Sequence, residues 1–74
     1  MTKPDIKPGI YLHFKGNRYE VIELARHSET EEWMVVYRAL YGEGGLWVRP
    51  ASMWLETVER DGKTFQRFTI VEEK

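Results

Sequence analysis

The sequence predicts an all-β fold, either a small antiparallel barrel or a strongly bent sheet. It would contain five to six short strands and one short helical turn near residues 50–54. Two observations support this prediction. Short runs rich in β-branched and aromatic residues recur along the chain. Turn-forming Gly, Asn, Asp and Pro residues separate these runs, so each strand is followed by a tight reversal.

The first two strands are expected at residues 9–14 and 18–26. Apolar and polar side chains alternate in the first, as they do in a half-buried strand. Residues 15–17 contain Gly and Asn, which tolerate positive φ, so the two strands would form an antiparallel hairpin. The alternation in the second strand breaks near Val21 and Ile22, which predicts a β-bulge or burial on both faces.

A polar loop at residues 27–32 leads to a third strand at 33–39, which is rich in aromatic and β-branched residues. A glycine-rich loop at 40–45 then precedes a short fourth strand at 46–49. Pro50 ends that strand because proline lacks the amide that a ladder needs.

Residues 50–54 can form one helical turn, with Pro favoured at its first position. Two further strands, 55–60 and 63–71, flank Asp61 and Gly62, the strongest hairpin pattern in the chain. Of the closed folds, an SH3-like barrel is the first choice, and an open meander with one covered face is the alternative.

The length of 74 residues corresponds to one domain, expected at 9–71, with a flexible arm at 1–8 and a solvated tail at 72–74. Aromatic residues make up 14% of the chain, and they supply the burial that a short domain without cysteine needs. No apolar run approaches the ~20 residues of a membrane span, and residues 1–8 lack a signal-peptide core. We therefore expect a cytoplasmic protein that does not contact a membrane.

The residue types give little support for catalysis or for a cofactor. There is no cysteine, and Ser28 and Ser52 lie outside any glycine-flanked elbow. His13 and His27 fall at opposite ends of the first hairpin, so a two-histidine metal site is not expected. We expect no catalytic residue, metal or cofactor, and an enzyme with a histidine base is the least favoured of the functions considered.

Arginine and aromatic residues around the third and fourth strands form the best candidate site. Trp47 and Arg49 share a face because strand side chains alternate. In a closed sheet, Arg38 on the third strand can neighbour Trp47 or Arg49 across the hairpin. A guanidinium beside an aromatic ring suits a flat or anionic ligand, because the fork pairs with oxygens and the ring stacks. The alternative is that the arginine stems only cover packed rings. The candidate ligand residues are Arg26, His27, Arg38, Tyr41, Trp47 and Arg49.

The sequence also resembles a bacterial family known as domain of unknown function 1653. The resemblance rests on residues 8–11, 13–21, 25–30, 35–42 and 46–50, with further matches at Met53, residues 56–58 and 67–68. It covers nearly the whole chain. Trp54 stands where the family pattern has Phe, and Gln66 precedes Arg67 where Pro is common. The resemblance implies a short stand-alone bacterial protein and includes residues 26–30, Arg38 and Arg49 in its pattern, but it implies no activity.

The expected function is therefore a non-catalytic binding module for an anionic ligand: a nucleotide, a single-stranded nucleic acid or a carboxylate. Eleven Lys and Arg against twelve Asp and Glu give a net charge of −1, so the bulk charge does not favour nucleic acid. The alternative is an SH3-like protein–protein interaction domain that uses its aromatic surface. The sequence does not decide the oligomeric state, since an open edge strand could pair with a second chain.

Overall fold

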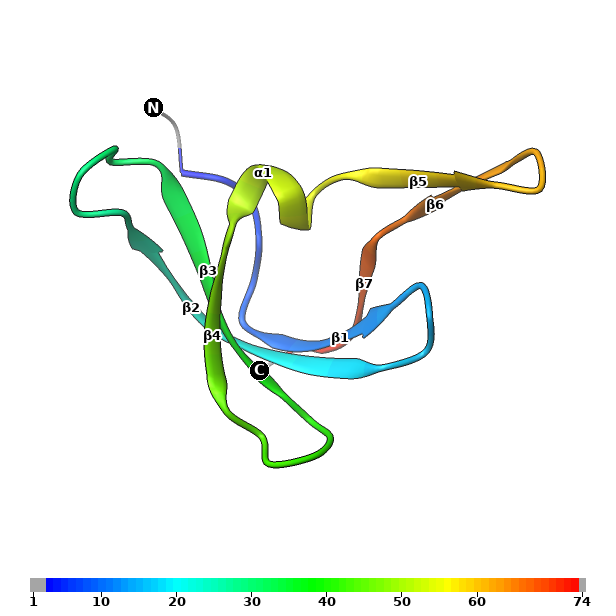
Figure 1. Ribbon diagram of the computed structural model, residues 1–74, viewed down its shortest axis with the longest axis horizontal. Helices are drawn as coiled ribbons and strands as arrows, with labels where there is room; N and C mark the ends of the chain where they lie inside the picture. The colour runs from blue at the N-terminus through cyan, green and yellow to red at the C-terminus, as the bar shows by residue number, and fades with distance from the viewer. Residues whose placement is uncertain (1–2, 74) are drawn as a thin grey trace.

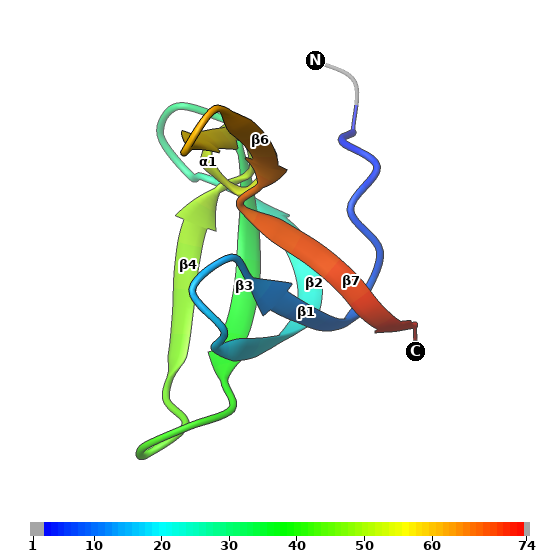
Figure 2. The ribbon, with the colours of Figure 1, turned by 90° about the vertical axis from the view of Figure 1, so that its right-hand side faces the viewer.

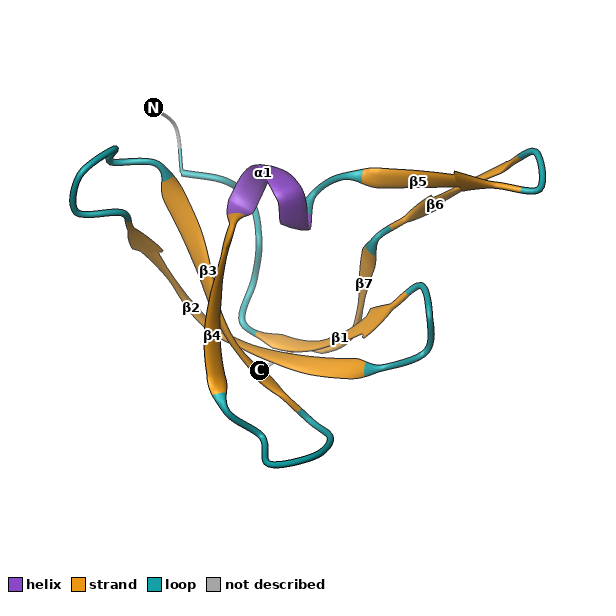
Figure 3. Cartoon of the chain, viewed as in Figure 1, coloured by secondary structure: helices purple, strands orange, loops and turns teal. Residues whose placement is uncertain are grey.

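A computed structural model describes residues 3–73 and shows a mainly β fold with one helical turn (Figures 1 and 3). In chain order the elements are β1 (Gly9–His13), β2 (Arg18–Arg26), β3 (Trp33–Ala39), β4 (Leu46–Pro50), α1 (Ala51–Trp54), β5 (Thr57–Arg60), β6 (Lys63–Gln66) and β7 (Phe68–Glu73). Within this part of the chain, no helix is long and apolar enough to cross a membrane.

Five antiparallel strands form one sheet in the order β4-β3-β2-β1-β7, and β5 and β6 form a separate hairpin. The hairpin projects from the body of the domain (Figure 1). Within residues 3–73 the sheet ends at β4 on one side and β7 on the other, without a pairing that would close it. The predicted antiparallel β fold is thus confirmed, whereas the SH3-like barrel is not seen.

The local features predicted for β2 and the hairpins are present. The β2–β3 register shifts between Val21 and Glu23, which is the predicted bulge. Asp61 and Gly62 both have positive φ, at 53° and 76°, as a tight two-residue hairpin requires. Local turn chemistry therefore sets these reversals.

The single strand predicted at 63–71 is wrong. The chain changes partner at Arg67, so that β6 pairs with β5 while β7 pairs with β1. The amide of Arg67 donates to the Glu56 carbonyl at 3.0 Å, and its own carbonyl accepts from the Phe14 amide at 3.0 Å. Arg67 thus joins the hairpin to the main sheet, a junction that the apolar pattern alone does not reveal.

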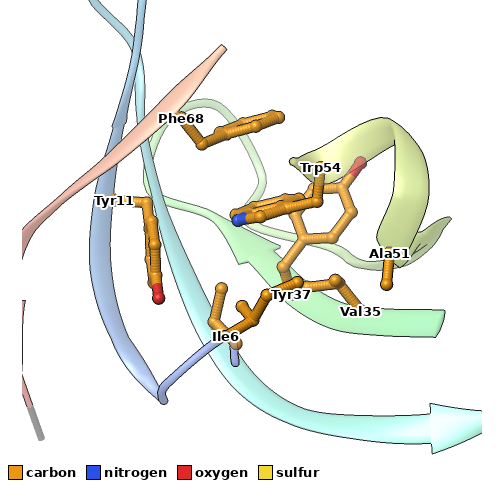
Figure 4. Close-up of a cluster of buried hydrophobic side chains, with 8 residues drawn as sticks. Ile6, Tyr11, Val35, Tyr37, Ala51, Trp54 and Phe68 are labelled. Atoms are coloured by element: carbon orange, nitrogen blue, oxygen red, sulfur yellow. The ribbon is translucent and has the colours of Figure 1, made fainter. Parts of the chain in front are cut away.

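The core lies on the inner face of the bent sheet, beneath α1 (Figure 4). Trp54, only 2% exposed, stacks on Phe68 with a 3.7 Å centroid separation and an interplanar angle of 2°. Tyr11 and Tyr37 contact the same indole at centroid distances of 5.6 and 5.2 Å. The helical turn therefore places the large Trp54 ring over the inner face of the sheet.

Both predicted terminal segments contribute more than the sequence indicates. Ile6, inside the stretch expected to be a flexible arm, is buried in the core. The Tyr11 hydroxyl donates to the Lys7 carbonyl at 2.8 Å and holds the same stretch against β1. At the other end β7 continues through Glu72 to Glu73, which are exposed, and residue 74 lies outside the described part.

Candidate functional site

A groove of about 490 Å³ opens between the β3–β4 hairpin and the start of β2. Four of its ten lining residues are aromatic, and the glycine-rich loop at 42–45 contributes another four. The lining residues are Tyr19, Tyr37, Ala39, Tyr41, Gly42, Glu43, Gly44, Gly45, Trp47 and Arg49.

Tyrosines from three parts of the chain form one wall of this groove. Tyr19 on β2 meets Tyr37 on β3 and Tyr41 in the loop, each at a ring-centroid distance of 5.6 Å and nearly perpendicular. The Tyr19 and Tyr41 hydroxyls share a hydrogen bond of 3.0 Å. Burial, followed by this hydrogen bond, raises the pKa of Tyr19 to about 12. The Tyr19 phenol is therefore neutral at physiological pH.

Trp47 and Arg49 supply the opposite wall from β4. Trp47 pairs with Tyr37 and Arg49 with Val35, so both β4 side chains share the inner face with core residues. Trp47 is 61% exposed, which leaves ring surface free for stacking. The Arg49 guanidinium lies 5.5 Å from the Phe68 ring centroid, where a cation–π contact holds it in place.

The inner face near Arg49 carries further positive charge. The pKa of His13 is lowered, first by burial and then by the charges of Arg67, Arg49 and Lys15. The imidazole packs against Phe68 at a centroid distance of 4.9 Å. Arg67 is also paired with the Glu56 carboxylate at 3.6 Å, and Glu43 lines the groove, so carboxylates lie near these cations.

Arg38 is not part of this groove, and its expected contact with Trp47 or Arg49 is wrong. Arg38 pairs with Leu46 across the hairpin and with Glu20 on β2. Arg38 directly follows Tyr37, and successive side chains of a strand point to opposite faces. The Arg38 side chain therefore lies on the outer face.

Arg26 and His27 lie at the far end of β2, some seven residues or about 23 Å from Tyr19 along an extended strand. The Arg26 guanidinium covers the Trp33 ring at 4.8 Å. His27 Nδ1 accepts hydrogen bonds from the amides of Glu29 and Thr30 at 3.1 and 3.3 Å. These contacts assign both residues a role in holding the β2–β3 loop.

Of the six predicted site residues, the groove thus brings together Tyr41, Trp47 and Arg49. Sequence reasoning missed Tyr19 as a lining residue, and it named Tyr37 as a flanking aromatic residue but did not include it among the candidate ligand residues. Their placement depends on the β2–β3 register, which pairs Tyr19 with Ala39 beyond the bulge. Counting from the loop at 27–32 without the bulge pairs Tyr19 with Leu40, on the face opposite to Tyr37, so the count places Tyr19 outside the groove.

The arrangement offers flat rings, one guanidinium and loop backbone, groups that can stack on a planar molecule and pair with an anion. Among residues 3–73, no group of three His, Asp or Glu side chains is placed to hold a metal ion.

The comparisons with known proteins agree on one family. The model of the family described as "Protein of unknown function (DUF1653)" matches residues 9–70. A crystal structure of a DUF1653 protein from Bordetella bronchiseptica is 39% identical in sequence, with a TM-score of 0.85 over 95% of this chain and 92% of that one. A search of curated proteins finds no match. The chain therefore belongs to the DUF1653 family of proteins of unknown function.

Proposed function

We propose that this protein is a non-catalytic, cytoplasmic binding module for an anionic ligand that carries a flat ring or planar group. The ligand class includes nucleotides, single-stranded nucleic acid and carboxylates. It would lie in the groove between Tyr19, Tyr41 and Trp47, with its anionic group at Arg49.

The observation that carries this proposal is the exposed ring of Trp47 beside the held guanidinium of Arg49, in a groove with tyrosine walls. Stacking on an aromatic side chain contributes about 1–3 kcal/mol per base. A guanidinium adds a charge-assisted, often bidentate hydrogen bond to an oxyanion. Both groups lie on one face, so one small ligand can use them together.

An amide NMR titration tests this function. The ¹⁵N-labelled protein is titrated with nucleoside monophosphates, a short single-stranded oligonucleotide and benzoate, first at low salt and then at physiological salt. We expect saturable shifts that cluster on Tyr19, Tyr41, Trp47 and Arg49, with binding of the charged ligands weakening as salt rises. Shifts scattered over the surface, or none at all with every ligand, would contradict the proposal.

A pair of arginine variants identifies the site. Arg49→Ala should weaken binding about tenfold or more, because a hydrogen bond to a charged group contributes about 1.5–3 kcal/mol. Arg38→Ala makes the same chemical change on the outer face of the neighbouring strand and should leave affinity within about twofold. Thermal unfolding of both variants shows whether Arg49 supports the fold instead: a lower Tm with unchanged affinity would make it structural.

A second candidate function is an interaction domain of the SH3-like kind. It is favoured by apolar exposure along β4, where Leu46, Trp47 and Val48 are each about 60% exposed. Capture on immobilised protein separates the two functions, because a protein partner held by apolar contacts should resist moderate salt while an oxyanion is released.

A further inference from the structure

Among the described residues no strand pairs with the outer edge of β4, which is apolar and long enough to pair with another strand. Figure 2 shows β4 at one margin of the sheet, with β3 beside it on one side only. Leu46, Trp47 and Val48 occupy three consecutive positions and are 61%, 61% and 60% exposed. No charged side chain interrupts these three positions, although edge strands usually carry such protection against pairing.

The alternation of hydrogen-bonded pairs between β3 and β4 shows which main-chain groups of β4 point away from β3. The Ala39 amide donates to the Gly45 carbonyl at 3.5 Å, so this pair is of the hydrogen-bonded type. Hydrogen-bonded and non-hydrogen-bonded pairs alternate in antiparallel ladders, which makes Trp47 and Arg49 the next residues bonded to β3. The main-chain groups of Leu46, Val48 and Pro50 therefore point away from the sheet.

We propose that β4 pairs antiparallel with β4 of a second copy of this chain, about a two-fold axis at Val48. Val48 is the midpoint of β4, so this register pairs the whole strand. It forms four hydrogen bonds: two between the Val48 residues, and one from each Leu46 amide to the Pro50 carbonyl opposite. Pro50 has no amide to donate, and this register asks only its carbonyl to take part.

Side-chain chemistry favours a second copy as the occupant of this edge. In the proposed register Trp47 lies opposite Arg49 of the partner subunit, on the same face and in a non-hydrogen-bonded pair, where side chains approach most closely. Two identical tryptophan–arginine pairs therefore form across the axis. On the outer face Val48 meets its own copy, so the strand is complementary to itself in charge and apolar character.

The pairing also completes the groove. Each Trp47 would lie between Tyr37 of its own chain and Arg49 of the partner subunit, so that each groove gains a second guanidinium at its open side. The inference that the groove is shared depends on the proposed function, whereas the inference of a dimer depends only on the features of β4. A single pair of edge strands forms a small interface, below the ~1,200–2,000 Å² of stable complexes, so association should depend on protein concentration.

Sedimentation velocity over a range from about 10 µM to about 1 mM measures the association. The wild type should shift from monomer to dimer across this range. Val48→Lys should remain monomeric, because it places two like charges directly opposite one another. Val71→Lys is the matched control: it makes the same change on β7, at the other edge of the sheet, where Val71 is 50% exposed. This variant should associate like the wild type.

Val48→Pro gives a second variant, because it removes the outward amide while sparing the bonds to β3, and edge strands tolerate proline. It should also be monomeric, with a folded CD spectrum. A wild type that remains monomeric at about 1 mM, or a dimer that survives Val48→Lys or is lost in Val71→Lys, would overturn the proposal.

An isotope-filtered NOE experiment on mixed labelled and unlabelled protein determines the register. Contacts between the Trp47 ring and the partner's Arg49 side chain are expected, whereas a dimer that lacks these contacts would refute this register. The ligand titration stands apart from these measurements. If ligand shifts the amide signals of the groove in monomeric Val48→Lys and the wild type forms no dimer, only the dimer is refuted. If the wild type forms a dimer but no ligand shifts the amide signals of the groove, only the ligand function is refuted.

Discussion

Replacement of Trp54 by Phe should leave the domain as stable as the wild type or make it more stable. Trp54 is the central ring of the core, stacked on Phe68 and 2% exposed. Its indole Nε1–H is buried and has no hydrogen-bond partner among the described residues. Phe keeps a ring that can stack and removes this donor.

Two opposing quantities set the expected result. The smaller ring loses roughly 40 Å² of buried apolar surface, or about 1 kcal/mol at about 25 cal/mol per Å². Removal of a buried donor that has no hydrogen-bond partner raises the free energy of unfolding by about 1–3 kcal/mol. The free energy of unfolding should therefore change by between about 0 and +2 kcal/mol. Trp54→Ala should instead lose about 3–5 kcal/mol, a large part of the ~4–11 kcal/mol expected for this length.

Urea denaturation followed by far-UV CD measures these changes, because CD does not depend on which tryptophan is removed. Trp47→Phe serves as the matched control at an exposed position and should lie within about 0.5 kcal/mol of the wild type. A loss of more than about 2 kcal/mol in Trp54→Phe would refute the reasoning, because it would show that the indole N–H is satisfied in the folded protein.

Three further predictions concern backbone space and titration. Gly9→Ala should destabilise the fold by more than about 1 kcal/mol in the same urea assay, because Gly9 has φ +151° and a Cβ there would overlap the Glu72 carbonyl oxygen; a neutral result would mean that β7 is not held against β1. The lowered pKa of His13 favours the neutral imidazole, so its contribution to stability is present above pH 6.5 and is lost as pH falls through the folded value. Its NMR titration midpoint should lie below 6.5, and a midpoint at or above 6.5 would contradict the lowering of the pKa by burial and by the neighbouring cations. The raised pKa of Tyr19 favours the neutral phenol, so stability is full below pH 10 and declines as pH rises from 10 to about 12; Tyr19→Phe should flatten that decline, and an unchanged alkaline profile would assign it to other groups.

Local sequence determined most of the secondary structure. The Asp61-Gly62 pair predicted the β5–β6 hairpin, and the broken alternation near Val21 predicted the bulge in β2. Such features depend on neighbouring φ preferences and on side-chain alternation, both of which are encoded within a few residues. The family resemblance was equally accessible, since it depends on residue identity along the chain.

Only the tertiary structure decided which strands pair and which side chains of different strands lie beside one another. The break at Arg67 transfers the chain from β5 to β1, and nothing in the apolar pattern of 63–71 records that exchange. Within residues 3–73 the sheet also remains open at β4 and β7, because closure depends on the accumulated twist and bending of all strands together.

The same division applies to the candidate site. The period of two along β4 determined that Trp47 and Arg49 share a face, and the structure agrees. Whether Arg38 joins them depended on cross-strand register, which pairs Tyr37 rather than Arg38 with Trp47. Tyr19 enters the groove through pairing between strands separated by the loop at 27–32. Alternation is a local property of the chain, whereas register is fixed by packing between strands, so the sequence determined the face of each side chain and the fold determined its neighbours.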